Sequence, residues 1–313
     1  MSDPQASYRT VLVDCLGVTA GEDVLVIADN ETRAIADGLV VEARALGAET
    51  VVAEMSVRPN NGAEPPHSIA AAMLSCDVVV APTTRSLSHT EARHAATEKG
   101  ARTATMPGIT HDMLERTMSA DYGEIRRRSR AVADALTGGR EVHVTSDEGT
   151  DVTFLVEGRT GLSDDGDLTA PGAFGNLPAG EGFIAPVEGA TQGRIVFDGA
   201  AVLYGEPLIV TIEDGYAVDL AGEAGDRFRR EIEPRGAEAF AVAELGIGTN
   251  DAARATGLVL EDEKILGSIH VAFGDNHTFG GTIRVSSHVD RVVLRPSVAV
   301  DGTMLLQDGR LLL

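Results

Sequence analysis

Asp23-Val-Leu-Val-Ile-Ala-Asp29 is an apolar run between two carboxylates, and it predicts a buried strand. A helical pattern follows from Thr32 to Leu46 and stops at Gly47, a residue type common just after a helix. The alternation continues, with strands predicted over Glu49–Met55, Asp77–Pro82 and Ala101–Met106, and helices over His67–Leu74, from a capping box at Ser88, and over Ser119–Leu136. Strands that alternate with helices through short links predict a parallel sheet flanked by helices.

From about Arg140 the pattern changes to one in which apolar and polar residues alternate. Such stretches cover Glu141–Thr145, Asp151–Glu157 and Gly193–Val202, and Leu208–Asp219 contains two of them around an Asp-Gly turn. They predict antiparallel sheet, with a helix inserted over Gly222–Glu233 and a long loop over Gly161–Gly182. We therefore expect an α/β N-terminal domain over residues 1–138 and an α+β C-terminal domain, rich in antiparallel sheet, over residues 139–313.

Composition and charge narrow the classes of function. The chain has 313 residues, with 26 Lys and Arg against 48 Asp and Glu, so its formal net charge is −22. This excess repels phosphate groups, so neither nucleic acid nor an anionic membrane is expected as a partner. The sequence has no apolar run near the roughly 18 residues of a membrane helix and no signal-peptide pattern. Cys15 and Cys76 are too few for a disulfide framework, so a cytoplasmic location is expected.

No nucleotide-binding motif accompanies the predicted parallel sheet. The turn Ala28-Asp-Asn-Glu31 has carboxylates where a phosphate would lie, and Gly246-Ile-Gly248 begins like a dinucleotide fingerprint but lacks its third glycine. The first domain is therefore expected to be a scaffold.

Three of the eight histidines, at positions 270, 277 and 288, lie close together in the C-terminal half. If Ile269–Phe273 is a strand, His270 points away from its apolar neighbours, and His288 and Asp290 share the polar face of a second strand. Two adjacent strands joined by a glycine-rich turn would bring these side chains together. A single histidine is more often an ordinary surface residue, but a His-x-Asp pair that follows the acidic segment Glu261-Asp-Glu263 favours a metal site. Imidazole and carboxylate suit Zn²⁺, Co²⁺, Mn²⁺ or Fe²⁺.

Six further segments lie in order along the chain: Ser86-Leu-Ser-His-Thr-Glu-Ala-Arg93, Thr105-Met-Pro-Gly108, Asn176-Leu-Pro-Ala-Gly-Glu-Gly-Phe-Ile-Ala-Pro186, Glu244-Leu-Gly-Ile-Gly-Thr-Asn250, Gly267-Ser-Ile-His-Val-Ala-Phe-Gly274 and His288-Val-Asp290. Together they resemble the aminopeptidase T family of metallo-aminopeptidases. The Asn-x-Pro-x-Gly-Glu and His-x-Asp elements are the most specific parts of the resemblance. Members of that family pair an α/β N-terminal domain with a C-terminal domain that carries two divalent metals, and they form homodimers.

The resemblance implies five ligands for two divalent ions (zinc, cobalt or manganese) in this chain: Glu181, Glu244, His270, His288 and Asp290. Glu263 is the nearest match to a further acidic ligand, with a gap of two residues. His277 stands where the family usually has a tyrosine, so it is expected near the metals as a ligand, a proton donor or a neighbour. The implied substrates are peptides, with Glu181 or Glu244 carrying a proton to the leaving amine after a metal-bridging water attacks.

The fold also resembles that of iron-dependent dioxygenases that open the ring of dihydroxypyridines and keep a His…His-x-Asp ligand set. Two histidines and one carboxylate with open positions suit a ferrous oxygenase. Because Glu181 and Glu244 are both present, two metals are favoured, and the first expectation is a metal-dependent aminopeptidase. A mononuclear Fe(II) dioxygenase acting on a dihydroxypyridine-like substrate is the alternative, and a non-catalytic binding protein is a third.

Overall fold

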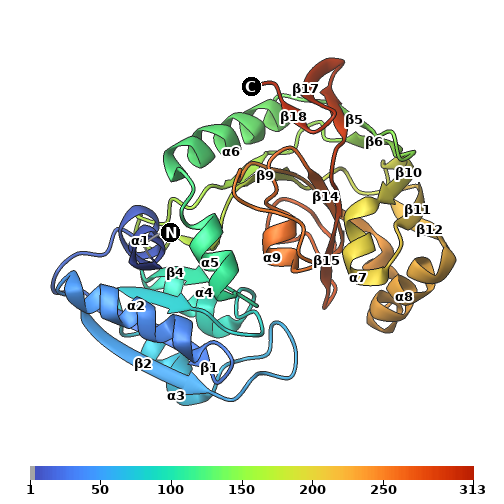
Figure 1. Ribbon diagram of the computed structural model, residues 1–313. Coiled ribbons are helices and arrows are strands. Elements are labelled where there is room, and N and C mark those ends of the chain that lie inside the picture. Colours follow the sequence, from blue (N-terminus) through green and yellow to red (C-terminus); the bar gives the residue numbers. More distant parts are fainter. Residues whose placement is uncertain (1–3) are drawn as a thin grey trace. The chain divides into compact units, whose positions relative to one another are not determined.

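The computed structural model describes residues 4–313, and its first half is built on a parallel five-stranded sheet, which we call sheet A (Figure 1). The strands in spatial order are β2 (Glu49–Met55), β1 (Asp23–Asp29), β3 (Val78–Ala81), β4 (Arg102–Thr105) and β8 (Phe174–Asn176). Every neighbouring pair is parallel. The four predicted strands and the parallel sheet are confirmed, and β8 adds a fifth strand that the sequence did not predict.

Helices cover both faces of sheet A. The helical elements of this half are α1 (Pro4–Arg9), the π-helix η1 (Thr10–Cys15), α2 (Arg33–Ala45), α3 (His67–Met73), α4 (Glu91–Glu98) and α5 (His111–Thr117). On one face, Leu25 and Ile27 of β1 join α3 and α4 in a buried apolar cluster. Helix α2 is not part of that cluster and packs on β1 and β2, so it covers the other face (Figure 1).

The predicted start of a helix at Ser88 is wrong. Helix α4 begins at Glu91, and the Thr90 hydroxyl caps it by accepting from Arg93 N at 3.3 Å. The Ser88 hydroxyl is engaged elsewhere, 2.8 Å from Thr105 Oγ1 and 3.1 Å from Asn176 Oδ1. A side chain held by these two partners is not available to cap a helix.

The segment 161–182 is also not the loop that the sequence predicted. It contains β7 (Leu162–Asp164), β8 and the start of β9 (Glu181–Ile184). Strands of three residues are too short to show a period-two pattern, and their partners are distant in sequence, because β8 pairs with β4.

Two antiparallel sheets make up the second half of the chain. Sheet B has the order β12 (Tyr216–Ala221), β11 (Leu208–Glu213), β10 (Gln192–Phe197), β6 (Asp151–Leu155), β5 (Glu141–Thr145), β16 (Ser297–Val300), β17 (Thr303–Gln307) and β18 (Arg310–Leu311). Sheet C has the order β15 (His288–Val293), β14 (Ile269–Gly274), β13 (Val242–Gly248), β9 and β7. The predicted antiparallel sheet is thus confirmed, as is the predicted inserted helix, α8 (Gly222–Ile232).

The two antiparallel sheets share one apolar core. Phe154 and Ile195 of sheet B, Leu245 and Val271 of sheet C and Phe228 of α8 belong to a single buried cluster. The other helical elements of this half are α6 (Tyr122–Thr137), α7 (Ala201–Tyr204), α9 (Val259–Asp262), η2 (Asp198–Ala200), η3 (Glu233–Arg235) and η4 (Ala237–Phe240). Because side chains alternate along a strand, one face of sheet C serves this core and the opposite face is left for polar residues.

The chain divides into two compact units, and each unit consists of two separate stretches of the chain. Unit 1 comprises Met1–Gly123 and Gly166–Ala179, and unit 2 comprises Glu124–Asp165 and Gly180–Leu313. Segment 166–179 belongs to unit 1 because it contains β8 of sheet A. The predicted domain boundary, between residues 138 and 139, is a single cut and stays a prediction. Within residues 4–313, no helix combines the length and apolar character needed to cross a bilayer.

Candidate metal centre

One face of sheet C gathers ionisable side chains from all five of its strands. Across β14 and β15, Ala272 lies opposite Asp290 and Gly274 lies opposite His288. Residues paired across two strands point to the same face, as do residues two apart on one strand. His270, two residues before Ala272, therefore shares a face with His288 and Asp290, as the alternation of the sequence predicted.

The neighbouring strands add carboxylates to this face. Glu244 on β13 lies opposite Ala272. Glu181 on β9 lies opposite Gly248 of β13 on one side and opposite Asp164 of β7 on the other. Sheet C thus brings together five of the predicted site residues, all within unit 2, and adds Asp164, which the sequence analysis missed.

Two glycines on β13 allow neighbouring groups to approach the strand closely. A Cβ at Gly246 would lie 2.1 Å from both Cε1 and Nε2 of His270, and a Cβ at Gly248 would lie 2.1 Å from the Ile265 carbonyl oxygen. The Gly-Ile-Gly pattern that resembles a dinucleotide fingerprint therefore has a different purpose. It lets the His270 ring lie directly over the neighbouring strand.

Glu244 lies between the two imidazoles. Its Oε1 is 3.0 Å from His270 Nε2, and its Oε2 is 3.5 Å from His288 Nε2. His288 Nε2 is also 3.4 Å from Asp290 Oδ1. On the far side of the His288 ring, Nδ1 donates to the Asp275 carbonyl oxygen at 2.8 Å. This hydrogen bond places a proton on Nδ1 and directs Nε2 at the carboxylates.

A buried lysine that the sequence analysis did not consider lies beside this cluster. Lys264 is 1% exposed, and its Nζ is 2.5 Å from Glu181 Oε1, 3.0 Å from Glu263 Oε1 and 3.3 Å from Asp164 Oδ2. Burial alone would lower the pKa of Lys264, but the three carboxylates raise it well above its usual value. The three carboxylates therefore favour the charged ammonium form of Lys264 despite its burial.

Two of the carboxylates around the ammonium, those of Asp164 and Glu263, have raised pKa values. Burial raises the pKa of Asp164 to about 7 and that of Glu263 to about 7, because loss of water disfavours the charged form and Lys264 only partly compensates. Near neutral pH each of these two carboxyl groups is therefore protonated part of the time.

The pKa values of the two imidazoles are also raised, but by neighbouring carboxylates rather than by burial. Burial opposes protonation of His270, but Glu181 and Glu244 outweigh it and raise the pKa of His270 to about 9. Asp290 and Glu244 likewise overcome burial and raise the pKa of His288 to about 10. Burial would raise the pKa of Asp290, but the positive charges, with His288 foremost, hold it well below its usual range. The cluster therefore attracts positive charge, which protons supply and a metal ion would replace.

The side chains present fit a divalent metal ion. Two groups of donor atoms lie within 4.8 Å of one another, Glu181–Glu244–His270 and Glu244–His288–Asp290, and Glu244 belongs to both. Glu181 Oε2 is buried and makes no hydrogen bond, although it faces His270 Nε2 at 3.2 Å. Imidazole nitrogens and carboxylate oxygens are the donors that zinc, manganese and ferrous iron take from proteins.

Glu263 and His277 lie outside both donor groups. Glu263 contacts Lys264, as described above. His277 lies on the connection between β14 and β15, where its Nδ1 is 2.8 Å from Asp275 Oδ1 and its side chain is 34% exposed. The ligand role predicted for Glu263 and the catalytic role predicted for His277 stay predictions.

Aromatic rings border the His288 side of the cluster. The Phe279 ring meets His288 edge to face at 5.7 Å between centroids, and it meets Phe183 in the same way at 5.7 Å. The β14–β15 connection that carries Phe279 is held by Glu188, which accepts from Thr282 N at 2.7 Å. Phe183, Phe279 and His288 are all partly exposed, so they form an accessible aromatic surface next to the donor groups.

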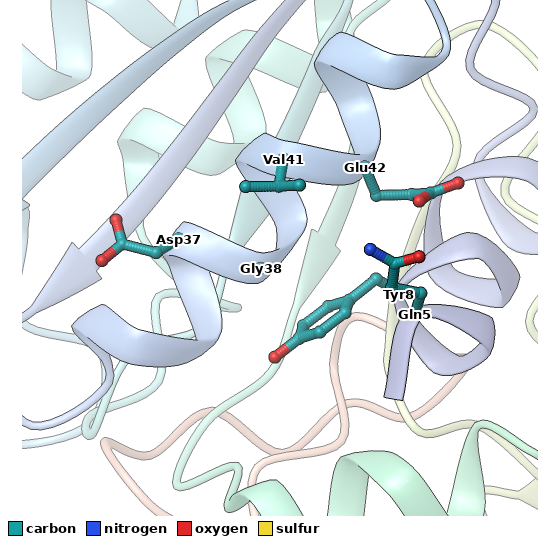
Figure 2. A pocket seen from close by; sticks show the side chains of 6 residues that line it. All are labelled: Gln5, Tyr8, Asp37, Gly38, Val41 and Glu42. Atoms are coloured by element: carbon teal, nitrogen blue, oxygen red, sulfur yellow. The ribbon is translucent and has the colours of Figure 1, made fainter. Parts of the chain in front are cut away.

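A cavity of about 300 Å³ lies in unit 1, between α1 and α2. It is lined by Gln5, Tyr8, Asp37, Gly38, Val41 and Glu42 (Figure 2). The Tyr8 ring lies so close to α2 that a Cβ at Gly38 would come within 2.2 Å of its Cζ. This lining contains neither histidine nor cysteine, so we assign it no chemistry.

Comparisons with known proteins identify a matching family and similar folds. The sequence model of the NicX family, 2,5-dihydroxypyridine 5,6-dioxygenase, matches residues 4–313. The structure of 2,5-dihydroxypyridine dioxygenase from Pseudomonas putida is similar, with a TM-score of 0.84 and 18% identity over 98% of this chain and 96% of that one. Wild-type AmpT from Thermus thermophilus has a TM-score of 0.71 and 19% identity over 99% of each chain. No curated protein sequence matches.

Both resemblances seen in the sequence are thus present, and at these identities each solved structure shares the fold. The family model goes further, because it covers all the described residues, including every strand of sheet C. This chain belongs to the 2,5-dihydroxypyridine 5,6-dioxygenase family.

Proposed function

We propose that this chain is a mononuclear Fe(II) dioxygenase that opens the ring of a dihydroxypyridine-like substrate. The observation that carries the proposal is the position of His270, His288 and Asp290 on one face of two adjacent strands, in a chain that belongs to this family. Two histidines and one carboxylate leave coordination positions open for substrate and dioxygen. The sequence alone favoured a metallo-aminopeptidase, with the dioxygenase as the alternative, and this proposal reverses that order.

His270 and His288 would hold the iron through Nε2, and Asp290 would hold it through its carboxylate. Ferrous iron, when bound, supplies the electron transfer that allows dioxygen to react with an aromatic ring. Gly246 and the Asp275 carbonyl position the two imidazoles for this task, the first by leaving space for His270 and the second by fixing the proton of His288 on Nδ1.

The surroundings of the cluster favour a planar aromatic substrate. Phe183 and Phe279 offer ring faces and edges against which a pyridine ring can pack. Glu244 is placed to accept a proton from a substrate hydroxyl, because its two oxygens lie 3.0 Å and 3.5 Å from the imidazole nitrogens and thus within reach of a group bound beside them. Loss of that proton makes the ring richer in electrons and easier to oxidise.

Oxygen consumption tests the proposal. Protein stripped of metal and reloaded with Fe²⁺ without air is mixed with 2,5-dihydroxypyridine in aerated buffer, and oxygen and ring absorbance are followed together. We expect one dioxygen consumed for each ring opened, and no consumption by the zinc-loaded protein. H288A and D290N should abolish consumption.

A histidine outside the site provides the control. His143 also pairs with an aspartate, with its Nε2 2.8 Å from Asp151 Oδ1, but on the exposed surface of sheet B. H143A should therefore retain full activity. If iron-loaded protein with measured iron content consumes no oxygen with any hydroxylated pyridine, the proposed function is wrong.

A metallo-aminopeptidase is the second candidate. It is favoured by the two donor groups that share Glu244, because a shared carboxylate is suited to bridging two ions that activate one water. In that case Glu181 or Glu244 would pass a proton to the leaving amine, and the enzyme would act as the homodimer that the resemblance implies. Release of coumarin from aminoacyl-coumarins by the zinc-, cobalt- or manganese-loaded protein, in the absence of oxygen, would support this candidate.

A further inference from the structure

A buried ammonium adjoins only one of the two donor groups. Lys264 Nζ lies 2.5 Å from Glu181, which belongs to the Glu181–Glu244–His270 group. Among residues 4–313, no member of the other group, Glu244–His288–Asp290, forms an ion pair with Lys264. We propose that Lys264 acts as a fixed cation in place of a second metal ion and so limits this chain to one divalent ion.

The contacts of Lys264 are those of a bound cation. Its ammonium has three N–H donors, and three carboxylates surround it, from Asp164 on β7, Glu181 on β9 and Glu263 just after α9. The Lys264 side chain is 1% exposed and the three carboxylate side chains are 9–13% exposed, so little water screens these contacts. Lys264 is therefore built into unit 2 as part of its charge balance.

This arrangement penalises a metal ion at the first donor group. Such an ion would share the Glu181 carboxylate with the ammonium, and like charges that share a buried ligand repel each other strongly because little water screens them. Glu181 Oε1 is already committed to Lys264, which leaves only Oε2 for a metal. No member of the second group forms an ion pair with Lys264, so a single ion is expected on that side of Glu244, with His288 and Asp290 among its ligands. The inference rests on the proposed function for the presence of a metal ion.

Manganese titration with electron paramagnetic resonance provides the test, together with elemental analysis of the loaded protein. The wild-type chain should bind one Mn²⁺ and give the six-line spectrum of an isolated ion. K264M keeps an unbranched side chain of similar volume, one atom shorter, and removes its charge, so it should bind two Mn²⁺, whose magnetic coupling through Glu244 broadens the spectrum. K99M, at the exposed second lysine of the chain, should behave as wild type, and E181Q/K264M should return to one ion.

Each outcome decides the question. Two ions in the wild-type chain, or one ion in K264M with a native near-ultraviolet circular dichroism spectrum, would overturn the inference. If K264M does not fold, the wild-type spectrum at saturating Mn²⁺ decides alone, since a coupled spectrum overturns the inference and an isolated-ion spectrum upholds it. One ion without oxygen consumption refutes the proposed function and leaves this inference standing, whereas oxygen consumption with two ions does the reverse.

Discussion

Replacing Gly246 by alanine tests whether strand β13 positions the His270 imidazole. The new Cβ would lie 2.1 Å from Cε1 and Nε2 of the ring, whereas ordinary contact begins at 3.4 Å, so the ring must move by about 1.3 Å. His270 is 1% exposed, and its Nε2 already lies 3.0 Å from Glu244. The ring therefore has no free space on that side, and the substitution must disturb the donor groups.

Two effects on stability oppose each other. Overpacking a buried position costs about 1–3 kcal/mol of the free energy of unfolding. Removing a glycine from the unfolded chain returns about 0.4–1 kcal/mol, because Gly246 does not adopt a positive φ and alanine tolerates its backbone conformation. We expect G246A to lose about 1–2 kcal/mol in the metal-free protein. Displacement of a ligand should also weaken metal binding about 10–100-fold, which is the effect of losing a group that orients a metal ligand.

Urea unfolding of the stripped protein and Mn²⁺ titration measure these two quantities. G138A is the matched control, because a Cβ there meets only the Asp134 carbonyl oxygen, at 3.8 Å. In the double variant G246A/H270A the collision is absent, so its cost in stability should be smaller than the sum of the two single costs. If G246A binds Mn²⁺ as tightly as wild type and unfolds at the same urea concentration, Gly246 does not determine the position of the His270 ring.

Three further predictions follow from other parts of the structure. Stripping the metal with a chelator should lower the melting temperature, and reloading to about 100 times the dissociation constant should restore about 2.7 kcal/mol; a melting temperature that is independent of Mn²⁺ or Fe²⁺ would argue against a metal centre. T90A should lose about 1 kcal/mol of unfolding free energy through loss of the cap of α4, with unchanged metal affinity; an effect on Mn²⁺ titration would contradict the separate roles of these residues. E188Q should loosen the β14–β15 connection, because Glu188 contacts the segment that carries Phe279 and none of the proposed metal ligands. The variant should therefore raise the KM for an aromatic substrate more than it changes metal affinity.

The local patterns of the sequence predict much of the fold because they report burial directly. Strand β1 is an apolar run with both faces covered, and its predicted bounds, Asp23–Asp29, are those in the structure. The alternation around His270 predicts which side chains share a face, and the register of β14 and β15 confirms it. Capping is less predictable, because Ser88 and Thr90 are both competent caps and the choice between them depends on Asn176, far away in sequence.

The charge balance of the candidate site could not be predicted from the sequence either, because it depends on contacts between segments that are distant in sequence. Glu263 looks like a displaced metal ligand in the sequence, yet it lies against the ammonium of the residue that follows it. Recognising this requires the pairing of β9 with β7, which brings Asp164 beside Glu181. A three-residue strand such as β7 has too little pattern to predict that pairing. The sequence does hold one clue to the importance of Lys264, which is that it is one of only two lysines in the chain.

Apart from Lys99 and Lys264, all Lys and Arg positions of this chain are arginines. The contacts at position 264 explain why a lysine is used there. A guanidinium is a planar fork that suits one or two carboxylates in its own plane, whereas three carboxylates from different segments converge on the Lys264 ammonium. A compact group with three N–H donors meets them without displacing β7 or β9. Methionine at this position would fill a similar volume but leave the carboxylates of Asp164, Glu181 and Glu263 facing one another. A divalent ion is then the group that restores neutrality, which is why the number of bound ions reports directly on the role of Lys264.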